Sequence, residues 1–100
     1  MARQVIWSKR SLELLKEILD YWTERNGTVT YSEKLYSLLQ IALVQLAKYP
    51  DTGRLTENIT IRYKKVRTYY IYYSFGDNIL KIIAVSHVKR KPEYLKSLID

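Results

Sequence analysis

Apolar side chains in the first half of the chain recur every three or four residues, which is the period of an amphipathic helix. One such run covers residues 11–26 and is followed by Gly27, a residue type that commonly ends a helix in the left-handed conformation. A second run starts at the sequence TYSE, where Thr30 has the spacing of a capping box, and ends at Tyr49 before Pro50. Since few residues separate the two runs, the pattern predicts an antiparallel helical hairpin.

The hydrophobic period changes to two residues after the turn-rich stretch PDTGRLTEN. Residues 59–65 and 69–75 alternate apolar with polar side chains, and the turn GDN leads into a third strand at residues 79–86. The β-prone stretch RQVIW at residues 3–7 precedes Ser8, the expected cap of the first helix. Proline at position 92 favours a short final helix over residues 92–99.

These elements predict a single domain over residues 1–100 with an α+β fold and the order β-α-α-β-β-β. We expect the helical hairpin to pack on one face of a small, mainly antiparallel four-stranded sheet. We take the phase of the alternating pattern that places four apolar side chains against the helices: Ile59, Ile61, Ile71 and Phe75. The other face is then open and carries polar and aromatic side chains: Thr60, Arg62, Lys64, Tyr70, Tyr72, Ser74 and, if the strand pairing permits, Lys81.

The net charge of +7 is concentrated in residues 59–100, which hold nine basic and three acidic side chains, against eight and seven in residues 1–58. A concentrated positive field attracts phosphates or an acidic protein segment. With tyrosines between its cations, the open face offers charge for the phosphates of a nucleic-acid strand and flat rings for its bases. Two plainer interpretations stay open, a solvated lysine face and the strand propensity of tyrosine.

Composition excludes several kinds of site. The chain has no cysteine and one histidine, so it cannot build a thiolate or His-rich metal centre, and its three glycines do not form a phosphate-binding loop. We therefore expect no metal and no cofactor. The amino terminus lacks the pattern of a signal peptide, and no segment has the roughly 18 apolar residues of a membrane span, so we expect a soluble, cytoplasmic protein without membrane contact.

The stretch YPDTGRLTENITIRYKKVRTYYIYYSFGDNILKIIAVSHVKRKPEYL resembles the RelE/ParE superfamily of toxins from bacterial type II toxin–antitoxin systems. The motifs that carry the resemblance are a first strand ending in VIWSKRSLELL, the helical hairpin, the YPDTGR loop, the Y-x-I-x-Y strand, the IIAVSH strand and the basic HVKRKP exit. Their order and spacing cover nearly the whole chain. The resemblance implies a toxin that a cognate antitoxin protein neutralises.

Members of this superfamily act in two ways. RelE-like toxins enter the ribosomal decoding site and cut mRNA, whereas ParE-like toxins inhibit DNA gyrase without nuclease chemistry. The leading hypothesis for this chain is a RelE-like, ribosome-dependent mRNA endoribonuclease that needs no metal and has the ribosome and mRNA as partners. The alternatives are a ParE-like inhibitor of DNA gyrase and an inactive relative that only binds antitoxin.

RNA cleavage without a metal requires deprotonation of the 2′-hydroxyl, stabilisation of the pentacoordinate phosphate and protonation of the departing 5′-oxygen. The resemblance implies that basic residues of the open face do this together with a tyrosine or histidine near the carboxyl end. His87 is the best candidate for proton transfer, because histidine alone ordinarily changes charge near neutral pH. The expected catalytic residues are His87, Arg90 and Tyr94, and the expected RNA-binding residues are Arg62, Lys64, Lys65, Arg67, Tyr70, Tyr72, Lys81, Lys89 and Lys91.

Two positions depart from the mRNA-cleaving members of the family. Val88 and Tyr70 stand where such members often carry arginine, so a catalytic arginine pair is not evident in this chain. His87 also has a structural interpretation, as a hydrogen-bonded side chain at the end of a strand. Tyr94 likewise has one, as a residue that packs the tail onto the sheet.

Overall fold

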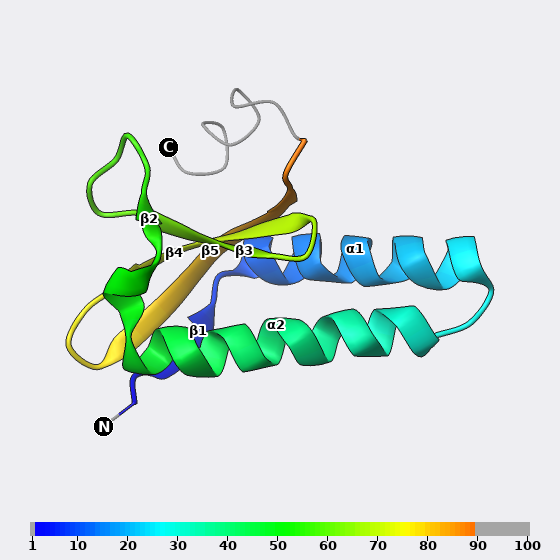
Figure 1. Cartoon of the computed structure of the whole chain (residues 1–100), viewed down its shortest axis with the longest axis horizontal. Helices are drawn as coiled ribbons and strands as arrows, with labels where there is room; N and C mark the ends of the chain where they lie inside the picture. The colour runs from blue at the N-terminus through cyan, green and yellow to red at the C-terminus, as the bar shows by residue number, and fades with distance from the viewer. Residues whose placement is uncertain (1, 90–100) are drawn as a thin grey trace.

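The computed structural model describes residues 2–89, which form two helices, one turn of 3-10 helix and a five-stranded mixed sheet. The helices form an antiparallel hairpin whose closed end extends beyond the sheet (Figure 1). The α+β class and the hairpin predicted from the sequence are confirmed, while the tail at residues 92–99 lies outside the described residues. The elements follow the chain in the order β1 (Gln4–Trp7), α1 (Lys9–Asn26), α2 (Thr30–Lys48), the 3-10 turn (Pro50–Thr52), β2 (Arg54–Leu55), β3 (Arg62–Val66), β4 (Tyr69–Phe75) and β5 (Ile79–His87).

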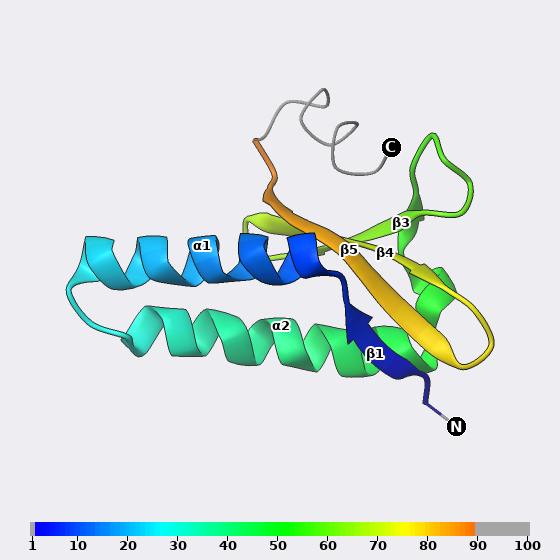
Figure 2. The same ribbon diagram turned by 180° about the vertical axis from the view of Figure 1, so that it is seen from behind.

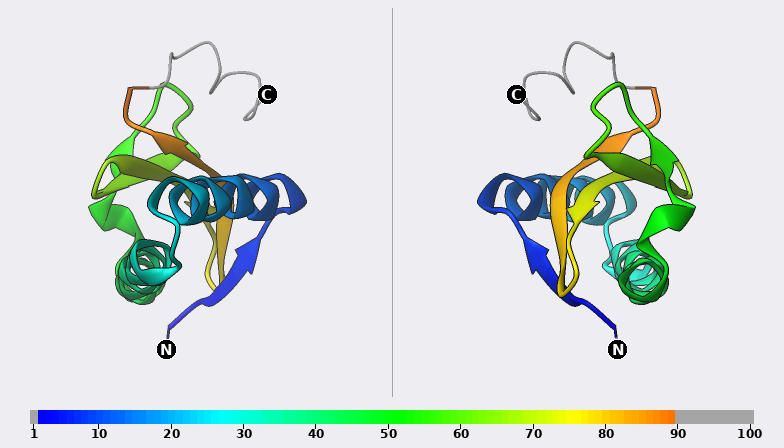
Figure 3. Two further views of the ribbon diagram at one scale, coloured as in Figure 1. Left: turned by 90° about the vertical axis from the view of Figure 1, so that its right-hand side faces the viewer. Right: turned by 90° about the vertical axis from the view of Figure 1, so that its left-hand side faces the viewer.

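The strands lie in the order β1-β5-β4-β3-β2, so the first and last strands of the chain, β1 and β5, are neighbours. β3, β4 and β5 form the predicted antiparallel meander, and β1 pairs in parallel with the first half of β5 (Figure 2). Figure 3 views the molecule along the helical hairpin. α2 packs on one face of the twisted sheet, which we call the helix side, while α1 starts at the edge of β5 and contributes Leu15 to the core on that side and Leu14 to a smaller cluster on the opposite face. The sequence predicted four strands. The fifth, β2, has only two residues, too few for any alternation to reveal it within a stretch of turn residues.

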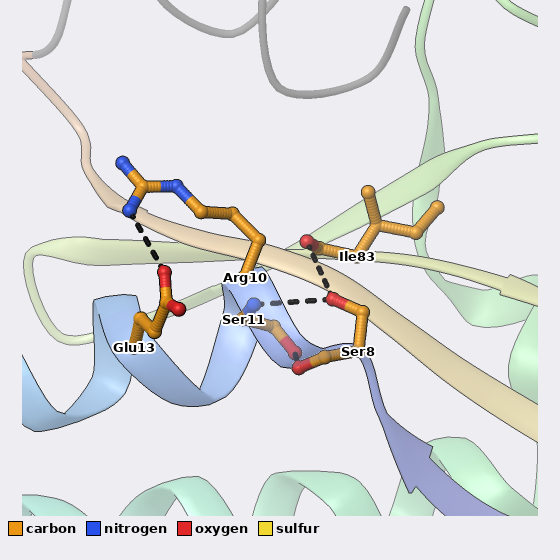
Figure 4. A network of polar contacts seen from close by, with 5 residues as sticks. All are labelled: Ser8, Arg10, Ser11, Glu13 and Ile83. Carbon is orange, nitrogen blue, oxygen red and sulfur yellow. Dashed lines mark hydrogen bonds and ion pairs between the residues drawn. The ribbon is translucent and has the colours of Figure 1, made fainter.

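Ser8 fixes the start of α1 against the edge of β5, as its role of helix cap requires (Figure 4). Its Oγ accepts a hydrogen bond from the Ser11 backbone N–H at 3.1 Å and donates to the carbonyl of Ile83 at 3.3 Å. The Ser11 hydroxyl donates back to the Ser8 carbonyl at 2.8 Å. The expected cap is confirmed, and it joins the first turn of the helix to the sheet.

The start of α2 differs from the prediction, because no capping box forms there. Val29 precedes the helix in a helical conformation, with φ −88° and ψ −1°, and no side chain caps the end. Its carbonyl already accepts from the Glu33 N–H at 2.9 Å, so Thr30 lies inside the helix and its hydroxyl is not at the cap position. The predicted stop of α1 is confirmed, since Gly27 has φ +70° and its N–H donates to the Thr23 carbonyl at 2.9 Å.

The main core lies between α2 and the sheet. Four leucines on one stripe of α2 are between 0% and 2% exposed: Leu35, Leu39, Leu43 and Leu46. They belong to one cluster with fully buried side chains of β4 and β5: Ile71, Tyr73, Leu80 and Ile82. Complete burial of a side chain of this size stabilises the fold by about 1.5–3 kcal/mol, so this layer holds the hairpin on the sheet.

The other face of the sheet carries a second, smaller cluster where the sequence predicted an open surface. Tyr72 is on the expected face but is only 4% exposed, because it packs with Leu14 of α1 and with Ile61. The prediction of an exposed Tyr72 is therefore wrong. Tyr63 and Tyr70 pack against the margin of this cluster and stay partly exposed.

The alternation in β3 has the opposite phase to the one predicted. Lys64 pairs with Ile71 and Arg62 with Tyr73, so both basic side chains start on the helix side of the sheet. Val66 packs against the main core, and residues two and four positions earlier in a strand must share its face. Long basic side chains near the edge of a sheet tolerate this placement, since their charged ends still reach the surface.

Ile59, which the sequence placed in a buried strand, is 82% exposed. The residues before β3 form a turn centred on Asn58, whose Oδ1 accepts from the Thr60 N–H at 3.0 Å and from its hydroxyl at 2.7 Å. The Ile61 N–H donates to the Asn58 carbonyl at 3.0 Å. These local bonds compete with strand pairing, so β3 begins at Arg62, and Ile61 is buried on the face opposite α2.

Tyr73 ties the loop after α2 to the centre of the sheet. Its buried hydroxyl donates to the Pro50 carbonyl at 2.5 Å and accepts from the Gly53 N–H at 3.0 Å. The Arg62 guanidinium donates to the Gly53 carbonyl at 2.8 Å and to the Asp51 carbonyl at 3.2 Å. These bonds hold the loop in the position from which β2 pairs with β3.

Tyr73→Phe is expected to lower the free energy of unfolding by about 2 kcal/mol, because it leaves the buried Gly53 N–H and the Pro50 carbonyl without the hydroxyl. Urea denaturation measures this loss. Tyr36→Phe is the matched control, since that ring is 43% exposed, and it is expected to change stability by less than about 0.5 kcal/mol. Equal stability of the two variants would contradict the role of the Tyr73 hydroxyl.

Candidate functional site

An open cleft of about 340 Å³ lies at the outer edge of β3. It forms because β2 pairs with only Arg62 and Tyr63, which leaves the rest of β3 without an outer strand among the described residues. We call this the basic cleft, since its lining has three cations and no acidic residue. The lining consists of Thr52, Gly53, Arg54, Tyr63, Lys64, Lys65 and Tyr70.

The basic cleft takes cations from both faces of β3. Lys64 and Lys65 are consecutive strand residues and point to opposite faces, but both line the cleft because it opens along the edge of the strand. Arg54 approaches from β2, where it pairs with Tyr63. Three cations without a neighbouring carboxylate in the lining favour an anionic ligand.

Arg62 does not line the basic cleft, although the sequence predicted it as an RNA-binding residue. Its Nη1 donates to the carbonyls of Gly53 and Asp51, so the side chain holds the loop that carries Arg54. Arg54 is the cleft residue that sequence reasoning missed. Its position directly after Gly53 was the one signal in the sequence. The sequence does not reveal that this loop lies close to the sheet.

Three tyrosines of the sheet face opposite α2 pack against one another beside the basic cleft. The ring of Tyr63 lies 5.1 Å from that of Tyr70, at an interplanar angle of 69°, and 5.9 Å from that of Tyr72. Burial raises the pKa of Tyr72 to about 12, and the neighbouring hydroxyls of Tyr70 and Tyr63 add to this increase. The Tyr72 hydroxyl therefore stays protonated at neutral pH and acts as a support for the two outer rings.

The raised pKa of Tyr72 predicts a loss of stability in alkali. The unfolded chain releases this proton near pH 10 and the folded chain only near pH 12, so the stabilisation is complete below pH 10 and falls as the pH rises toward 12. Tyr72→Phe is expected to make the fall in unfolding free energy between pH 10 and 12 shallower. Urea titrations at several pH values measure it, and a wild-type slope in Tyr72→Phe would contradict the prediction.

The end of β5 holds His87 by two contacts. Its Nδ1 accepts a hydrogen bond from the Lys89 backbone N–H at 3.1 Å, and its ring packs edge-on against Tyr69 with the centroids 5.5 Å apart. The Val88 N–H donates to the Thr68 carbonyl at 2.8 Å, which joins the end of β5 to the turn between β3 and β4. Because Nδ1 is the acceptor, the hydrogen of the neutral ring lies on Nε2.

His87 faces the helix side of the sheet and lines a second open cleft, of about 490 Å³, between α1 and the ends of β4 and β5. Trp22 closes part of this cleft through a hydrogen bond from its Nε1 to the Tyr69 hydroxyl at 2.8 Å. We call it the aromatic cleft. Its lining mixes apolar side chains with charges of both signs and so does not select anions: Leu14, Glu17, Ile18, Tyr21, Trp22, Arg25, Tyr69, Val85, Ser86 and His87.

The two clefts lie at the same end of the sheet, the basic cleft at the outer edge of β3 and the aromatic cleft between α1 and the ends of β4 and β5. Lys65 and Tyr70 belong to one cross-strand row, and His87 belongs to the next row toward the end of the sheet. Successive rows point to opposite faces, so the sheet itself separates His87 from Lys65. The structure brings the predicted residues Lys64, Lys65 and Tyr70 together in the basic cleft and leaves His87 outside it.

The remaining predicted residues are placed as follows. Arg67 is exposed in the turn between β3 and β4, with φ +58°. Lys81 is exposed and pairs with Ser74, so it shares the face of the three tyrosines as expected. Lys89 is exposed after β5. Three predicted residues lie outside the described part of the chain: Arg90, Lys91 and Tyr94.

Two negative findings concern residues 2–89. Their histidine, aspartate and glutamate side chains form no group of three or more that could hold a metal ion. Neither of the two helices is both long enough and apolar enough to cross a membrane.

Comparison with known proteins gives matches along most of the chain. A family model described as "ParE toxin of type II toxin-antitoxin system, parDE" matches residues 5–92. Toxin RelE2 of Caulobacter vibrioides is 30% identical over 87 residues, which cover 87% of this chain and 97% of that protein. A chain in the solved chromosomal ParDE system from P. aeruginosa has a TM-score of 0.74 at 13% identity, covering 86% of this chain and 96% of that chain, and so shares the fold.

Proposed function

The chain belongs to the RelE/ParE superfamily as the toxin of a type II toxin–antitoxin system, and on this premise we propose that it is a RelE-like, ribosome-dependent mRNA endoribonuclease. The observation that carries the proposal is the basic cleft, which combines three cations with two tyrosines and has no acidic residue in its lining. The relationship to Toxin RelE2 supports the RelE-like branch. A cognate antitoxin is the partner that toxins of this kind have, and translating ribosomes in the cytoplasm are the proposed place of action.

In the proposed reaction, the cations of the basic cleft bind the RNA backbone at the cleaved phosphate. The ribose 2′-hydroxyl gives its proton to water while its oxygen attacks the phosphorus, and the bond to the 5′-oxygen breaks, which leaves a 2′,3′-cyclic phosphate. Negative charge on the non-bridging oxygens increases in the transition state. Lys64, Lys65 and Arg54 are placed to stabilise that charge. Fixed cations of this kind are worth more in the transition state than in the ground state, which is the condition for catalysis.

His87 enters the proposal as the donor of a proton to the departing 5′-oxygen: the imidazolium form gives its Nε2 proton to that oxygen and becomes the neutral ring. Because the departing oxygen is bonded to the phosphorus itself, this role requires the cleaved phosphate to lie at the end of the sheet, between the Lys65 and His87 side chains, with the adjoining RNA backbone in the basic cleft. Arg67 and Lys89 are exposed at that end and would accompany the backbone. The hydrogen bond from the Lys89 N–H to Nδ1 stabilises the neutral ring that remains after the proton has been transferred.

His87→Ala is expected to lower the rate of mRNA cleavage on ribosomes by about 100-fold without weakening RNA binding. His87→Gln is the informative companion, because its amide can accept from the Lys89 N–H and still donate a hydrogen bond but cannot transfer a proton. Both variants are expected to lose cleavage. Wild-type cleavage by His87→Gln would restrict the histidine to a structural role at the end of β5.

A ParE-like inhibitor of DNA gyrase is the second candidate. Two observations favour it, the match of residues 5–92 to the ParE toxin model and the separation of His87 from the basic cleft. In that case the toxin binds gyrase and performs no chemistry, and the His87 variants keep full toxicity.

Induction of the toxin in growing cells separates the two candidates. Primer extension on abundant transcripts reports mRNA cleavage, and isolation of covalent gyrase–DNA complexes from the same cultures reports poisoned gyrase. We expect new mRNA ends within minutes and no rise in gyrase–DNA complexes. Intact mRNA together with trapped gyrase would replace the first proposal by the second.

A further inference from the structure

We propose that the free edge of β1 binds an extended, acidic segment of the cognate antitoxin, which adds a strand to the sheet. We call this surface the β1 edge; it consists of the backbone of Gln4–Trp7 on the side away from β5. The contact rests on the family of the chain, a type II toxin, and not on the target that the toxin inhibits.

The register of β1 leaves two of its residues without a partner strand for their backbone groups. Gln4 and Ser8 donate their N–H groups to carbonyls of the β4–β5 turn and of β5, at 3.0 and 3.1 Å. Because alternate residues of a strand bond to the same neighbour, Ile6 also faces β5, whereas Val5 and Trp7 direct their N–H and C=O groups outward. β1 is an end strand of the described sheet (Figure 3), so these outward groups are available to an added strand.

The β1 edge has none of the features that commonly prevent pairing with another chain. Natural edge strands often carry lysine, proline or a bulge, or are very short. The four residues of β1 are uncharged, their register with β5 is regular, and three of them favour strands: Val5, Ile6 and Trp7. The opposite end of the sheet, β2, has only two residues. The β1 edge is therefore the better of the two ends for strand addition.

Apolar side chains are exposed on both sides of the β1 edge. The residues before and after Ile6 pack against the main core, so Ile6 points to the face opposite α2, where it is 39% exposed. On the helix side, the Arg3 N–H donates to the Ala47 carbonyl at 3.0 Å, which places the end of α2 beside β1. Val44 lies one turn before Ala47 and is 57% exposed. An added strand can cover both apolar side chains, because its own side chains alternate between the two faces.

Charge at the two ends of the β1 edge favours an acidic occupant over a second copy of this chain. Arg3 and Lys48 lie at its start and Lys9 follows its end, while Asp77 in the β4–β5 turn offsets only one of these charges. Two copies that paired antiparallel about Ile6 would bring Arg3 of each copy toward Lys9 of the other. Such like charges disfavour association, whereas an acidic segment is attracted. The antitoxin is the protein that a toxin of this family binds, so we assign the segment to it.

The β1 edge lies apart from the basic cleft. β5 and β4 separate β1 from β3, so the distance is three strand spacings, or roughly 14 Å. A strand bound at the β1 edge therefore holds the antitoxin on the toxin without entering the basic cleft. Toxins with a damaged β1 edge are expected to stay toxic and to escape neutralisation.

Amide hydrogen exchange measured by NMR tests the contact, on the toxin alone and in its complex with co-expressed antitoxin. The Val5 and Trp7 amides are expected to exchange rapidly in the free toxin and at least about 100-fold more slowly in the complex. A nuclear Overhauser effect from the Ile6 Hα to an antitoxin Hα is also expected, because Ile6 occupies a non-hydrogen-bonded position of the new strand pair. Unchanged exchange of both amides would overturn the proposal. Their protection in the toxin alone would do so too, since it would assign the edge to a second copy.

Two charge reversals test the acidic character of the segment. Lys9→Glu is expected to weaken antitoxin binding at least about fivefold. Lys34→Glu is the matched control, because it makes the same change at an exposed position of α2 about 20 Å along the helix from Ala47, and it is expected to stay within about twofold of the wild type. Both variants are expected to arrest growth when produced alone, and only Lys9→Glu requires additional antitoxin for rescue. Equal losses of binding in the two variants would contradict the assignment.

The β1 edge and the proposed function fail in distinguishable ways. Amide exchange and antitoxin affinity do not depend on mRNA cleavage, so intact mRNA on ribosomes would remove the nuclease proposal and leave the edge contact standing. Unprotected Val5 and Trp7 amides in the complex would remove the edge contact and leave the nuclease proposal standing.

Discussion

Replacing Lys64 and Lys65 together by glutamine is expected to reduce ribosome-dependent mRNA cleavage by at least about 100-fold. Both lysines line the basic cleft from opposite faces of β3, and glutamine keeps most of their length while removing their charge. Without them, Arg54 alone remains among the cations of the cleft to stabilise the additional negative charge of the transition state. Primer extension on mRNA from a translation reaction measures the loss, and circular dichroism checks that the variant is folded.

A control with the same net charge separates the cleft from a general positive field. Lys16→Gln combined with Lys34→Gln removes two exposed lysines of the helices, and the ion pair of Lys16 with Asp20 is too exposed to matter for stability. This control is expected to cleave mRNA within about threefold of the wild type, because neither lysine lines the basic cleft and salt screens exposed charges. Equal losses in the two double variants would show that net charge, and not the basic cleft, accounts for the activity.

Gly53→Ala is expected to destabilise the chain by about 3 kcal/mol or more and to abolish toxicity. A Cβ at this position would overlap with the Tyr73 hydroxyl oxygen and lie 2.8–2.9 Å from two carbons of the ring. The ring cannot move away, because Tyr73 is 0% exposed and its hydroxyl bonds both Pro50 and Gly53. The substitution therefore breaks those bonds or displaces the loop that carries Arg54.

Two further variants make this expectation specific to the contact. Gly76→Ala is the control, since a Cβ there would meet no atom within 4 Å, and it is expected to change stability by less than about 0.5 kcal/mol. In the background of Tyr73→Phe, Gly53→Ala is expected to lower the free energy of unfolding by less than it does in the wild type, because the hydroxyl oxygen nearest to the new Cβ has been removed. Urea denaturation of the wild type, the two single variants and the Gly53→Ala, Tyr73→Phe double variant measures this coupling. Strict additivity of the two losses would contradict the steric explanation.

The parts of the fold that the sequence predicted are those in which one local signal decides the outcome. Ser8 caps α1, Gly27 ends it in the left-handed conformation, and residues 69–75 form β4 at the predicted bounds. In each case the residue type has a single strong preference and no distant partner competes with it. The helical hairpin could be predicted for the same reason, since two helices with one apolar stripe each and a short connection have few other ways to pack.

The parts that the sequence did not predict depend on contacts between distant residues. The phase of β3 was read from Ile59 and Ile61, but Val66 decides it by packing into the main core, so Arg62 and Lys64 start on the helix side. Strand β2 exists because Tyr73 draws the loop at Gly53 onto the sheet. No periodicity encodes such contacts, because they join residues 20 positions apart.

The candidate site shows the same division. Sequence and family resemblance pointed to Lys64, Lys65 and Tyr70, which the structure gathers in one cleft. Arg54 was missed and Arg62 was given an RNA-binding role, because their positions are set by the loop and not by the alternation of β3. His87 was expected beside the phosphate-binding face. It lies one cross-strand row beyond Tyr70, so its side chain points to the other face of the sheet.

The most direct test of the central claim is a purified translation reaction with added toxin, in which the 5′ ends of the mRNA are mapped by primer extension. The wild-type chain is expected to produce new ends within the translated region only when ribosomes are present, and the Lys64→Gln, Lys65→Gln variant is expected to produce none. Intact mRNA and undiminished protein synthesis with the wild-type toxin would contradict the claim that the basic cleft cleaves RNA.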